Sequence, residues 1–144
     1  FMKKVEIFTD GGCKGNPGPG GYGCVLKQND HVKELKGGAP QTTNNIMEMT
    51  AVIVALKQLN GPCEIRLTTD SQYVVKGMTE WMKGWIRNGW KTASRQPVKN
   101  KELWQELDEV SKPHTIKWIW VKGHSGHPEN ERCDQLANEA IAEL

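Results

Sequence analysis

The first third of the chain alternates apolar and polar positions with the period of β-strands. Residues 4–9 alternate in this way, and Asp10-Gly11-Gly12 ends the predicted strand. After a predicted turn over residues 16–21, residues 23–28 and 32–37 show the same alternation and would be joined by a short turn. The pattern therefore predicts an antiparallel meander of three strands.

From residue 45 onward, the pattern changes to helices that alternate with strands. Residues 45–59 are apolar almost all round a helix, which indicates a helix buried against a sheet. Further elements are predicted in chain order: a strand over 64–69, helical segments over 71–79 and 78–85, a helix over 101–111, an interior strand over 116–121 and an amphipathic helix over 130–144. Because parallel strands need helical crossovers, we expect an α/β fold. Its mixed five-stranded sheet has three antiparallel strands followed by parallel ones, with helices packed on it.

Length and composition favour one ordinary globular domain spanning residues 1–144. The 144 residues, 37% of them hydrophobic, are enough to bury one core and too few for two. No apolar run approaches the roughly 20 residues of a membrane helix, and the first six residues contain no apolar signal core. Four cysteines without a C-x-x-C pair favour reduced thiols over a disulfide framework or a zinc site. We therefore expect a cytoplasmic monomer with no membrane partner.

Positive charge is concentrated in one segment of the chain. Residues 76–101 contain seven basic residues and one acidic residue, a balance of +6 in a chain whose net charge is +2. Such asymmetry predicts a polyanionic partner. Trp81, Trp85 and Trp90 lie in the same segment. The spacing of Trp81 and Trp85 fits an ordinary core stripe as well as it fits a nucleic-acid surface.

Four carboxylates fall where the predicted elements would bring them together. Asp10 and Asp70 end the first and fourth strands, while Glu48 and Asp134 lie in the first and last helices. Carboxylates this close repel one another unless a divalent cation neutralises them, and hard oxygen ligands suit Mg²⁺ or Mn²⁺. A pair of Mg²⁺ ions, which Mn²⁺ could replace, would support hydrolysis of a phosphodiester.

Each of these residues also has a simpler explanation. Asp10 could serve only the turn, Asp70 could only cap the next helix, and Glu48 could form a capping pair with Asn45. Asp134 could be a solvated surface residue, although it lies about 20° from Ile141 on a helical wheel, flanks the apolar stripe and so should face the sheet. A lone loop histidine such as His124 usually has no function, yet its imidazole titrates near neutrality and could move protons.

Five motifs in order resemble the type I ribonucleases H of bacteria, and the resemblance spans nearly the whole chain. They are Ile7-Phe8-Thr9-Asp10-Gly11, Asn16-Pro17-Gly18-Pro19-Gly20-Gly21, Thr43-Asn44-Asn45 with Met47-Glu48, Thr69-Asp70-Ser71-Gln72-Tyr73-Val74, and Trp120-Val121-Lys122-Gly123-His124 through Asn130-Glu131 to Asp134. The resemblance implies a ribonuclease H-like fold in which Asp10, Glu48, Asp70 and Asp134 hold the metal ions and His124 is an auxiliary catalytic residue.

The resemblance also implies a substrate. The expected enzyme is an endonuclease that hydrolyses the RNA strand of RNA/DNA hybrids and leaves 3′-hydroxyl and 5′-phosphate ends. The positions that match RNA-contacting residues of the family are Cys13, Asn16, Asn44 and Gln72. The positions that match its pocket for a DNA phosphate are Thr43 and Asn100. A basic protrusion at about 80–100 is expected to grip the DNA strand, and its matching residues are Trp81, Trp85 and Trp90. Gln41 stands where some family members carry an arginine, which implies weaker affinity for the DNA strand.

Two other functions fit parts of this pattern. A DNA-cutting nuclease or integrase of the same fold would share the acidic metal ligands, but it would be expected to lack the basic tryptophan segment and the set Asn16, Asn44 and Gln72. A non-catalytic hybrid-binding module would keep the basic segment and lack a carboxylate. All four carboxylates are present.

Overall fold

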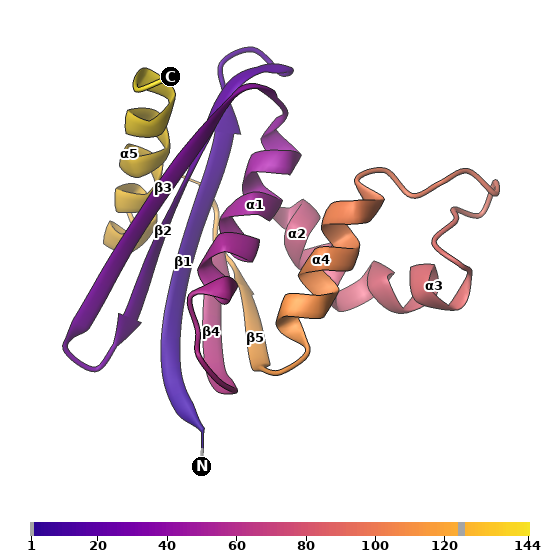
Figure 1. Ribbon diagram of the computed structural model, residues 1–144, viewed down its shortest axis with the longest axis horizontal. Coiled ribbons are helices and arrows are strands. Elements are labelled where there is room, and N and C mark those ends of the chain that lie inside the picture. The colour runs from indigo at the N-terminus through magenta and orange to yellow at the C-terminus, as the bar shows by residue number, and fades with distance from the viewer. Residues whose placement is uncertain (1, 124–125) are drawn as a thin grey trace.

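The computed structural model describes residues 2–123 and 126–144, which are built on one five-stranded sheet with the strand order β3-β2-β1-β4-β5 (Figure 1). The strands are β1 (Lys3–Cys13), β2 (Gly18–Gln28), β3 (His31–Thr42), β4 (Cys63–Thr69) and β5 (Thr115–Trp120). β2 pairs antiparallel with β1 and β3, while β4 runs parallel to β1 and to β5. The predicted mixed sheet is confirmed.

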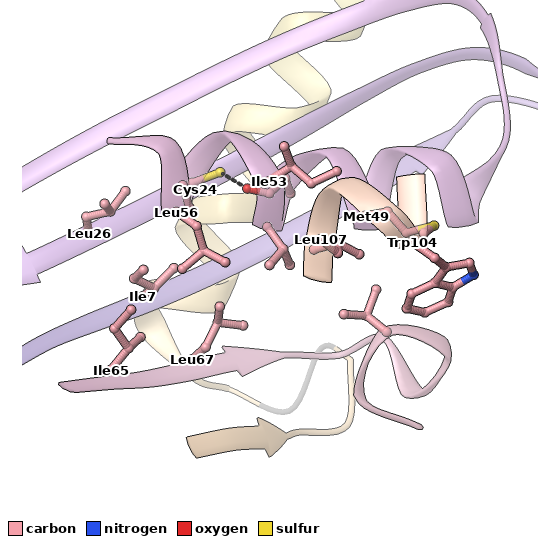
Figure 2. Close-up of a cluster of buried hydrophobic side chains, with 14 of the residues drawn as sticks. Ile7, Cys24, Leu26, Met49, Ile53, Leu56, Ile65, Leu67, Trp104 and Leu107 are labelled. Carbon is pink, nitrogen blue, oxygen red and sulfur yellow. Dashed lines mark hydrogen bonds between the residues drawn. The ribbon is translucent and has the colours of Figure 1, made fainter. Parts of the chain in front are cut away.

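Helices cover both faces of this sheet. They are α1 (Asn44–Lys57), α2 (Gln72–Lys76), a π-helical turn (Gly77–Trp81), α3 (Met82–Arg87), α4 (Lys101–Ser111) and α5 (Pro128–Ala142). α5 lies on one face, and α1 and α4 lie on the other (Figure 1). The larger core fills the α1 side, where Ile7, Leu67 and Trp104 are fully buried (Figure 2). On the α5 side, Phe8 packs against a smaller cluster. Alternation along β1 thus supplies both cores.

The antiparallel strands are longer than their sequence pattern predicts. Pairing between β1 and β2 continues to Gly12 opposite Gly21 and Cys13 opposite Gly20, so glycines that suggested a turn belong to the ladder. Glycine weakens a strand by itself, but Gly11 and Gly23 in these two strands admit a close helix, as described below. The interior position predicted for the strand over 116–121 is wrong. β5 is the edge strand beside β4, and its Trp120 is 43% exposed.

The two helical segments predicted between residues 71 and 85 form one continuous run. α2, the π-helical turn and α3 follow one another without a break, and the extra residue in a π turn shifts the face that α3 presents. Within the described ranges, no helix is long and apolar enough to cross a membrane. The four cysteines are free thiols, as the sequence predicted.

Candidate active site

Three carboxylates meet at the carboxyl ends of β1 and β4. Asp10 lies in β1, Asp70 directly follows β4, and Glu48 lies one turn into α1. One ligand atom from each of the three lies within 4.8 Å of the others. Three acidic side chains from separate elements therefore converge on one point, as the sequence predicted.

A close approach between β1 and α1 brings Glu48 beside Asp10. A Cβ atom added at Gly11 would lie 2.5 Å from the carbonyl carbon of Met47 and 2.7 Å from the backbone nitrogen of Glu48. Because real Cβ atoms do not come so near to backbone, only glycine lets α1 sit at this distance from β1. Gly11 therefore sets the separation between two acidic side chains.

A similar contact on the opposite face of the sheet positions Asp134. A Cβ atom at Gly23 of β2 would lie 2.3 Å from the carbonyl oxygen of Cys133, so α5 rests directly on the strand. Asp134 thereby reaches Asp10, which it influences as a neighbouring charge and through a side-chain hydrogen bond. The expectation that Asp134 faces the sheet is confirmed, although its oxygens are not part of the tight cluster of three.

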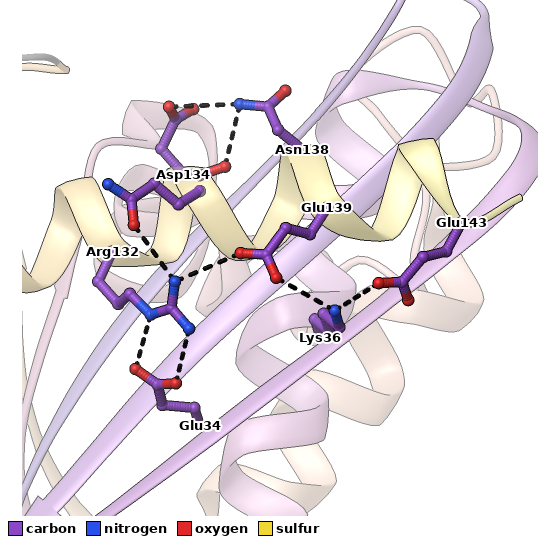
Figure 3. Close-up of polar contacts among 8 residues, drawn as sticks. Glu34, Lys36, Arg132, Asp134, Asn138, Glu139 and Glu143 are labelled. Atoms are coloured by element: carbon purple, nitrogen blue, oxygen red, sulfur yellow. Dashed lines mark hydrogen bonds and ion pairs between the residues drawn. The ribbon is translucent and has the colours of Figure 1, made fainter.

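Ion pairs join α5 to β3. Arg132 forms a bidentate pair with Glu34 of β3 at 2.8 and 2.9 Å and also reaches Glu139, while Lys36 binds both Glu139 and Glu143. Figure 3 shows this network on the side of α5 away from Asp134. Each exposed pair contributes little alone, but together they help to hold the helix that carries Asp134 against the sheet.

Residues other than the carboxylates cap α1 and α2. The hydroxyl of Ser71, rather than Asp70, accepts the backbone N–H of Val74 at the start of α2, at 3.1 Å. Thr43 caps α1 in the same way by accepting the N–H of Ile46 at 3.2 Å. The capping explanations for Asp70 and Glu48 are therefore wrong. The backbone of Asp70 is also held by the Trp120 indole, which donates to its carbonyl oxygen at 3.0 Å.

The electrostatics of the cluster favour proton or cation uptake. Burial, followed by the charges of Asp70 and Asp134, raises the pKa of Asp10 to about 8, although the Gly11 N–H donates to its Oδ1 at 2.9 Å. Burial raises the pKa of Glu48 well above its usual range, and the charges of Asp70 and Asp10 add to this effect. Among the described residues, neither Oε1 of Glu48 nor Oδ1 of Asp70 has a hydrogen-bond partner. Buried oxygens without donors fit a divalent cation.

A polar cluster lies beside the carboxylates. Oδ1 of Asn44 accepts the backbone N–H of Cys13 at 2.9 Å and lies 3.3 Å from its thiol, while Oδ1 of Asn16 accepts the backbone N–H of Asn44 at 3.1 Å. Three of the four residues predicted to contact RNA are therefore in direct contact with one another. The fourth, Gln72, is exposed at the first position of α2, two residues after Asp70.

The basic segment projects from the body of the protein (Figure 1). Its rings form a continuous run, from Trp90 to Trp85 at 6.0 Å and from Trp85 to both the buried Trp104 at 5.2 Å and Trp81 at 5.8 Å between centroids. Trp85 and Trp90 are partly buried against the core, whereas Trp81 is 36% exposed. The core-stripe explanation thus holds in part for Trp85.

The two residues predicted to bind a DNA phosphate each begin a helix. Thr43 caps α1, and Asn100 precedes α4 with a left-handed backbone at φ 60°. The side-chain amide of Asn100 donates to the Tyr73 hydroxyl at 3.2 Å. His124 lies outside the described residues. Asn130, which stands in the sequence only as part of a motif, lines the same cavity as Asp10, Asp70 and Asp134.

Comparisons with known proteins agree with this geometry. The RNase H family model matches residues 2–142. A ribonuclease H from Hydrogenovibrio crunogenus is 62% identical over 99% of this chain and 99% of its own, and one from Brucella anthropi is 62% identical over 97% of this chain and 91% of its own.

Solved structures with the same fold include ribonucleases H. A type 1 RNase H with the type 2 active-site motif superposes with a TM-score of 0.90 at 33% identity, covering 99% of this chain and 74% of its own. An RNase H1 solved in complex with an RNA/DNA hybrid superposes with a TM-score of 0.72 at 26% identity, covering 96% of this chain and 97% of its own.

Proposed function

This chain belongs to the ribonuclease H family and is an endonuclease for the RNA strand of RNA/DNA hybrids, and we propose that Asp10, Glu48, Asp70 and Asp134 carry its reaction. The observation that supports this assignment best is the convergence of oxygens from Asp10, Glu48 and Asp70 within 4.8 Å. His124 is the proposed auxiliary residue, because its imidazole can exchange protons near neutral pH.

We propose Mg²⁺ as the cofactor, with two ions per site that Mn²⁺ can replace. Carboxylate oxygens are the ligands these hard cations prefer, and the raised pKa of Asp10 and of Glu48 supports the proposal that the cluster takes up positive charge. When bound, the ions supply activation of a water and stabilisation of the leaving oxygen. The protein's own contribution is to hold the carboxylates rigidly, through the contacts of Gly11 and Gly23.

The neighbouring polar groups are suited to recognise the RNA strand. The side-chain amides of Asn16, Asn44 and Gln72 can each donate and accept, which is the complement that a 2′-hydroxyl requires. Asn16 and Asn44 are already fixed by their contacts with each other and with Cys13. We therefore propose that this cluster reads the ribose edge next to the scissile phosphate.

The projecting segment is the proposed site for the DNA strand. Trp81 offers an exposed ring, Trp85 and Trp90 support it, and the +6 balance of residues 76–101 suits phosphates. Thr43 and Asn100 would hold one DNA phosphate. Gln41, exposed on β3, adds no charge to that pocket.

We further propose that residues 1–144 act as one domain and as a monomer in the cytoplasm. A single continuous sheet and one main core support the single domain. Four free thiols suit a reducing compartment. Light scattering after gel filtration would test the oligomeric state.

Strand discrimination tests the proposed function. With Mg²⁺ present, the protein should cut the RNA strand of a labelled hybrid internally, leave 3′-hydroxyl and 5′-phosphate ends, and spare DNA and RNA duplexes of the same sequence. Single 2′-deoxy substitutions should suppress cleavage only near the substituted position, because the 2′-hydroxyl distinguishes the strands. Equal cutting of the DNA duplex would contradict the assignment and would favour a DNA nuclease of the same fold.

Charge removal tests the role of the projecting segment. Replacing the exposed Lys83, Arg87 and Lys91 by alanine should weaken hybrid binding and flatten its salt dependence, by about 0.9 units of slope per lost phosphate contact. Arg95 is better left unchanged because its φ is 63°. Turnover at saturating hybrid should change little.

A matched control removes the same charge elsewhere. Lys3, Lys33 and Lys112 are exposed and lie outside residues 76–101, so their replacement by alanine should leave the salt slope near that of the unmodified protein. Equal slopes for the two triple variants would place the projecting segment outside the interface.

A further inference from the structure

Asn130, an asparagine with no side-chain hydrogen-bond partner among the described residues, lies beside the carboxylate cluster. A cavity of about 20 Å³ lies between the end of β4 and the start of α5, and its lining includes Asp10, Asp70, Asp134 and Asn130. The side-chain nitrogen and oxygen of Asn130 are both buried, and neither has a partner among the described residues. Within residues 2–123 and 126–144, an entire side-chain amide is thus unsatisfied at the edge of the site.

Such an arrangement needs an explanation, because buried polar groups nearly always have a partner. Leaving one unsatisfied costs stability, and an apolar residue of similar size would avoid that cost. Asn130 is the third residue of α5, and no side-chain cap is formed at the N-terminus of this helix. The amide therefore does not serve the helix end.

Its position on α5 relates the amide to a metal ligand. Asn130, Asp134 and Asn138 are spaced by four residues and lie on one face of the helix. Asn138 is satisfied within the protein, since its amide donates to the carbonyl oxygen of Asp134 at 3.1 Å and to its Oδ2 at 3.4 Å. Asn130, one turn before Asp134, is part of the cavity lining, and its amide makes no such bond among the described residues.

The cavity is the right size for water. A volume near 20 Å³ exceeds the roughly 10 to 15 Å³ that one water molecule requires, and a buried water needs two to four polar partners. Asn130 offers a donor and an acceptor, while the carboxylates of Asp10, Asp70 and Asp134 offer further acceptors. An amide can supply both functions without adding a fifth negative charge.

We propose that Asn130 is a positioning residue whose amide holds an ordered water in this cavity, in the hydration shell of the cation bound by the carboxylates. This role rests on the metal site of the proposed function. Mg²⁺ keeps several of its waters when proteins bind it, and groups that hold such waters contribute to affinity and orientation. Asn130 thus acts through the water and does not touch the ion.

The test is titration of MgCl₂ or MnCl₂ into the hybrid-free protein, followed by calorimetry. Asn130→Ala should weaken metal binding about 10-fold or more, as losses of outer-sphere partners do. Gln135→Ala removes an exposed amide from the same helix and should bind as the unmodified protein does. In EDTA, the Tm of Asn130→Ala should be unchanged or higher, because the variant loses an unsatisfied group and gains a better helix former.

Each outcome has a separate meaning. Unchanged metal affinity in Asn130→Ala would overturn the proposed role of Asn130. A lower Tm of this variant in EDTA would also overturn it, because the amide would then contribute to folding. Asp10→Asn provides the reference for the site itself. If Asp10→Asn bound metal as tightly as the unmodified protein, the metal site of the proposed function would fail instead.

Discussion

Asp10→Asn should abolish turnover while it stabilises the metal-free protein. The substitution keeps the shape of the side chain but removes a charged oxygen from the centre of the cluster, where Asp10 meets Asp70 and Asp134. Several kcal/mol of transition-state stabilisation depend on a correctly held metal, so activity should fall by about 1,000-fold or more. The measurement is hybrid cleavage at saturating substrate and Mg²⁺.

The stability gain should depend on pH in a defined direction. The pKa of Asp10 is about 8 in the folded protein and near 3.8 when unperturbed. The folded state therefore binds the extra proton, and Asp10 destabilises the protein increasingly as pH rises from about 4 to 8. Asn cannot ionise, so the gain from Asp10→Asn should vanish near pH 4 and reach roughly 1 to 3 kcal/mol near pH 8 in EDTA.

Asp30→Asn is the matched control for this experiment. Asp30 is an exposed aspartate in the short turn between β2 and β3, at the end of the sheet opposite Asp10, so its replacement should alter neither activity nor the pH profile. Near-normal cleavage by Asp10→Asn, or a loss of stability at pH 8, would contradict the proposed role of Asp10.

Gly77→Ala should destabilise the protein strongly. A Cβ atom at Gly77 would lie 2.0 Å from Cη2 of Trp104, whose ring is fully buried. Overpacking of this kind costs about 1 to 3 kcal/mol or more, because either the ring or the π-helical turn must shift. Urea denaturation should show a lower midpoint with an unchanged slope.

Gly84→Ala provides the control for this prediction. Gly84 lies in α3, and outside its own stretch of helix no atom of the described residues lies within 4 Å of a Cβ atom added there. Alanine should therefore raise stability by up to about 1 kcal/mol through helix propensity. If Gly77→Ala were as stable as Gly84→Ala, the packing of Trp104 against the π-helical turn would be looser than the structure shows.

Hydrophobic periodicity predicted most of the fold. The sheet type, the long helix around Ile53 and the bounds of α4 follow from local pattern, because each element buries one face. What the pattern missed depends on tertiary contacts. β5 is apolar on both faces and therefore resembles an interior strand, yet it lies at the edge. The glycines of β1 and β2 suggested a turn, because sequence alone does not reveal a helix packed against them.

The candidate site was predicted more from motifs than from pattern. Strand ends predicted that Asp10 and Asp70 would be neighbours, but the capping alternatives could be rejected only once Ser71 and Thr43 were seen to cap their helices. The orphaned amide of Asn130 has no sequence signal of its own. Its importance depends on which partners are missing, and this is visible only in three dimensions.

The two glycine contacts bear on how the family can diverge. Gly11 and Gly23 carry no chemistry, yet each sets how closely a helix approaches the sheet, from opposite faces. Exposed residues of α1 and α5 can change during evolution, whereas neither glycine position should tolerate a side chain. In a saturation library screened for cleavage, substitutions at Gly11 and Gly23 should abolish activity as often as substitutions at the carboxylates do. Catalysis therefore depends partly on residues that have no functional group.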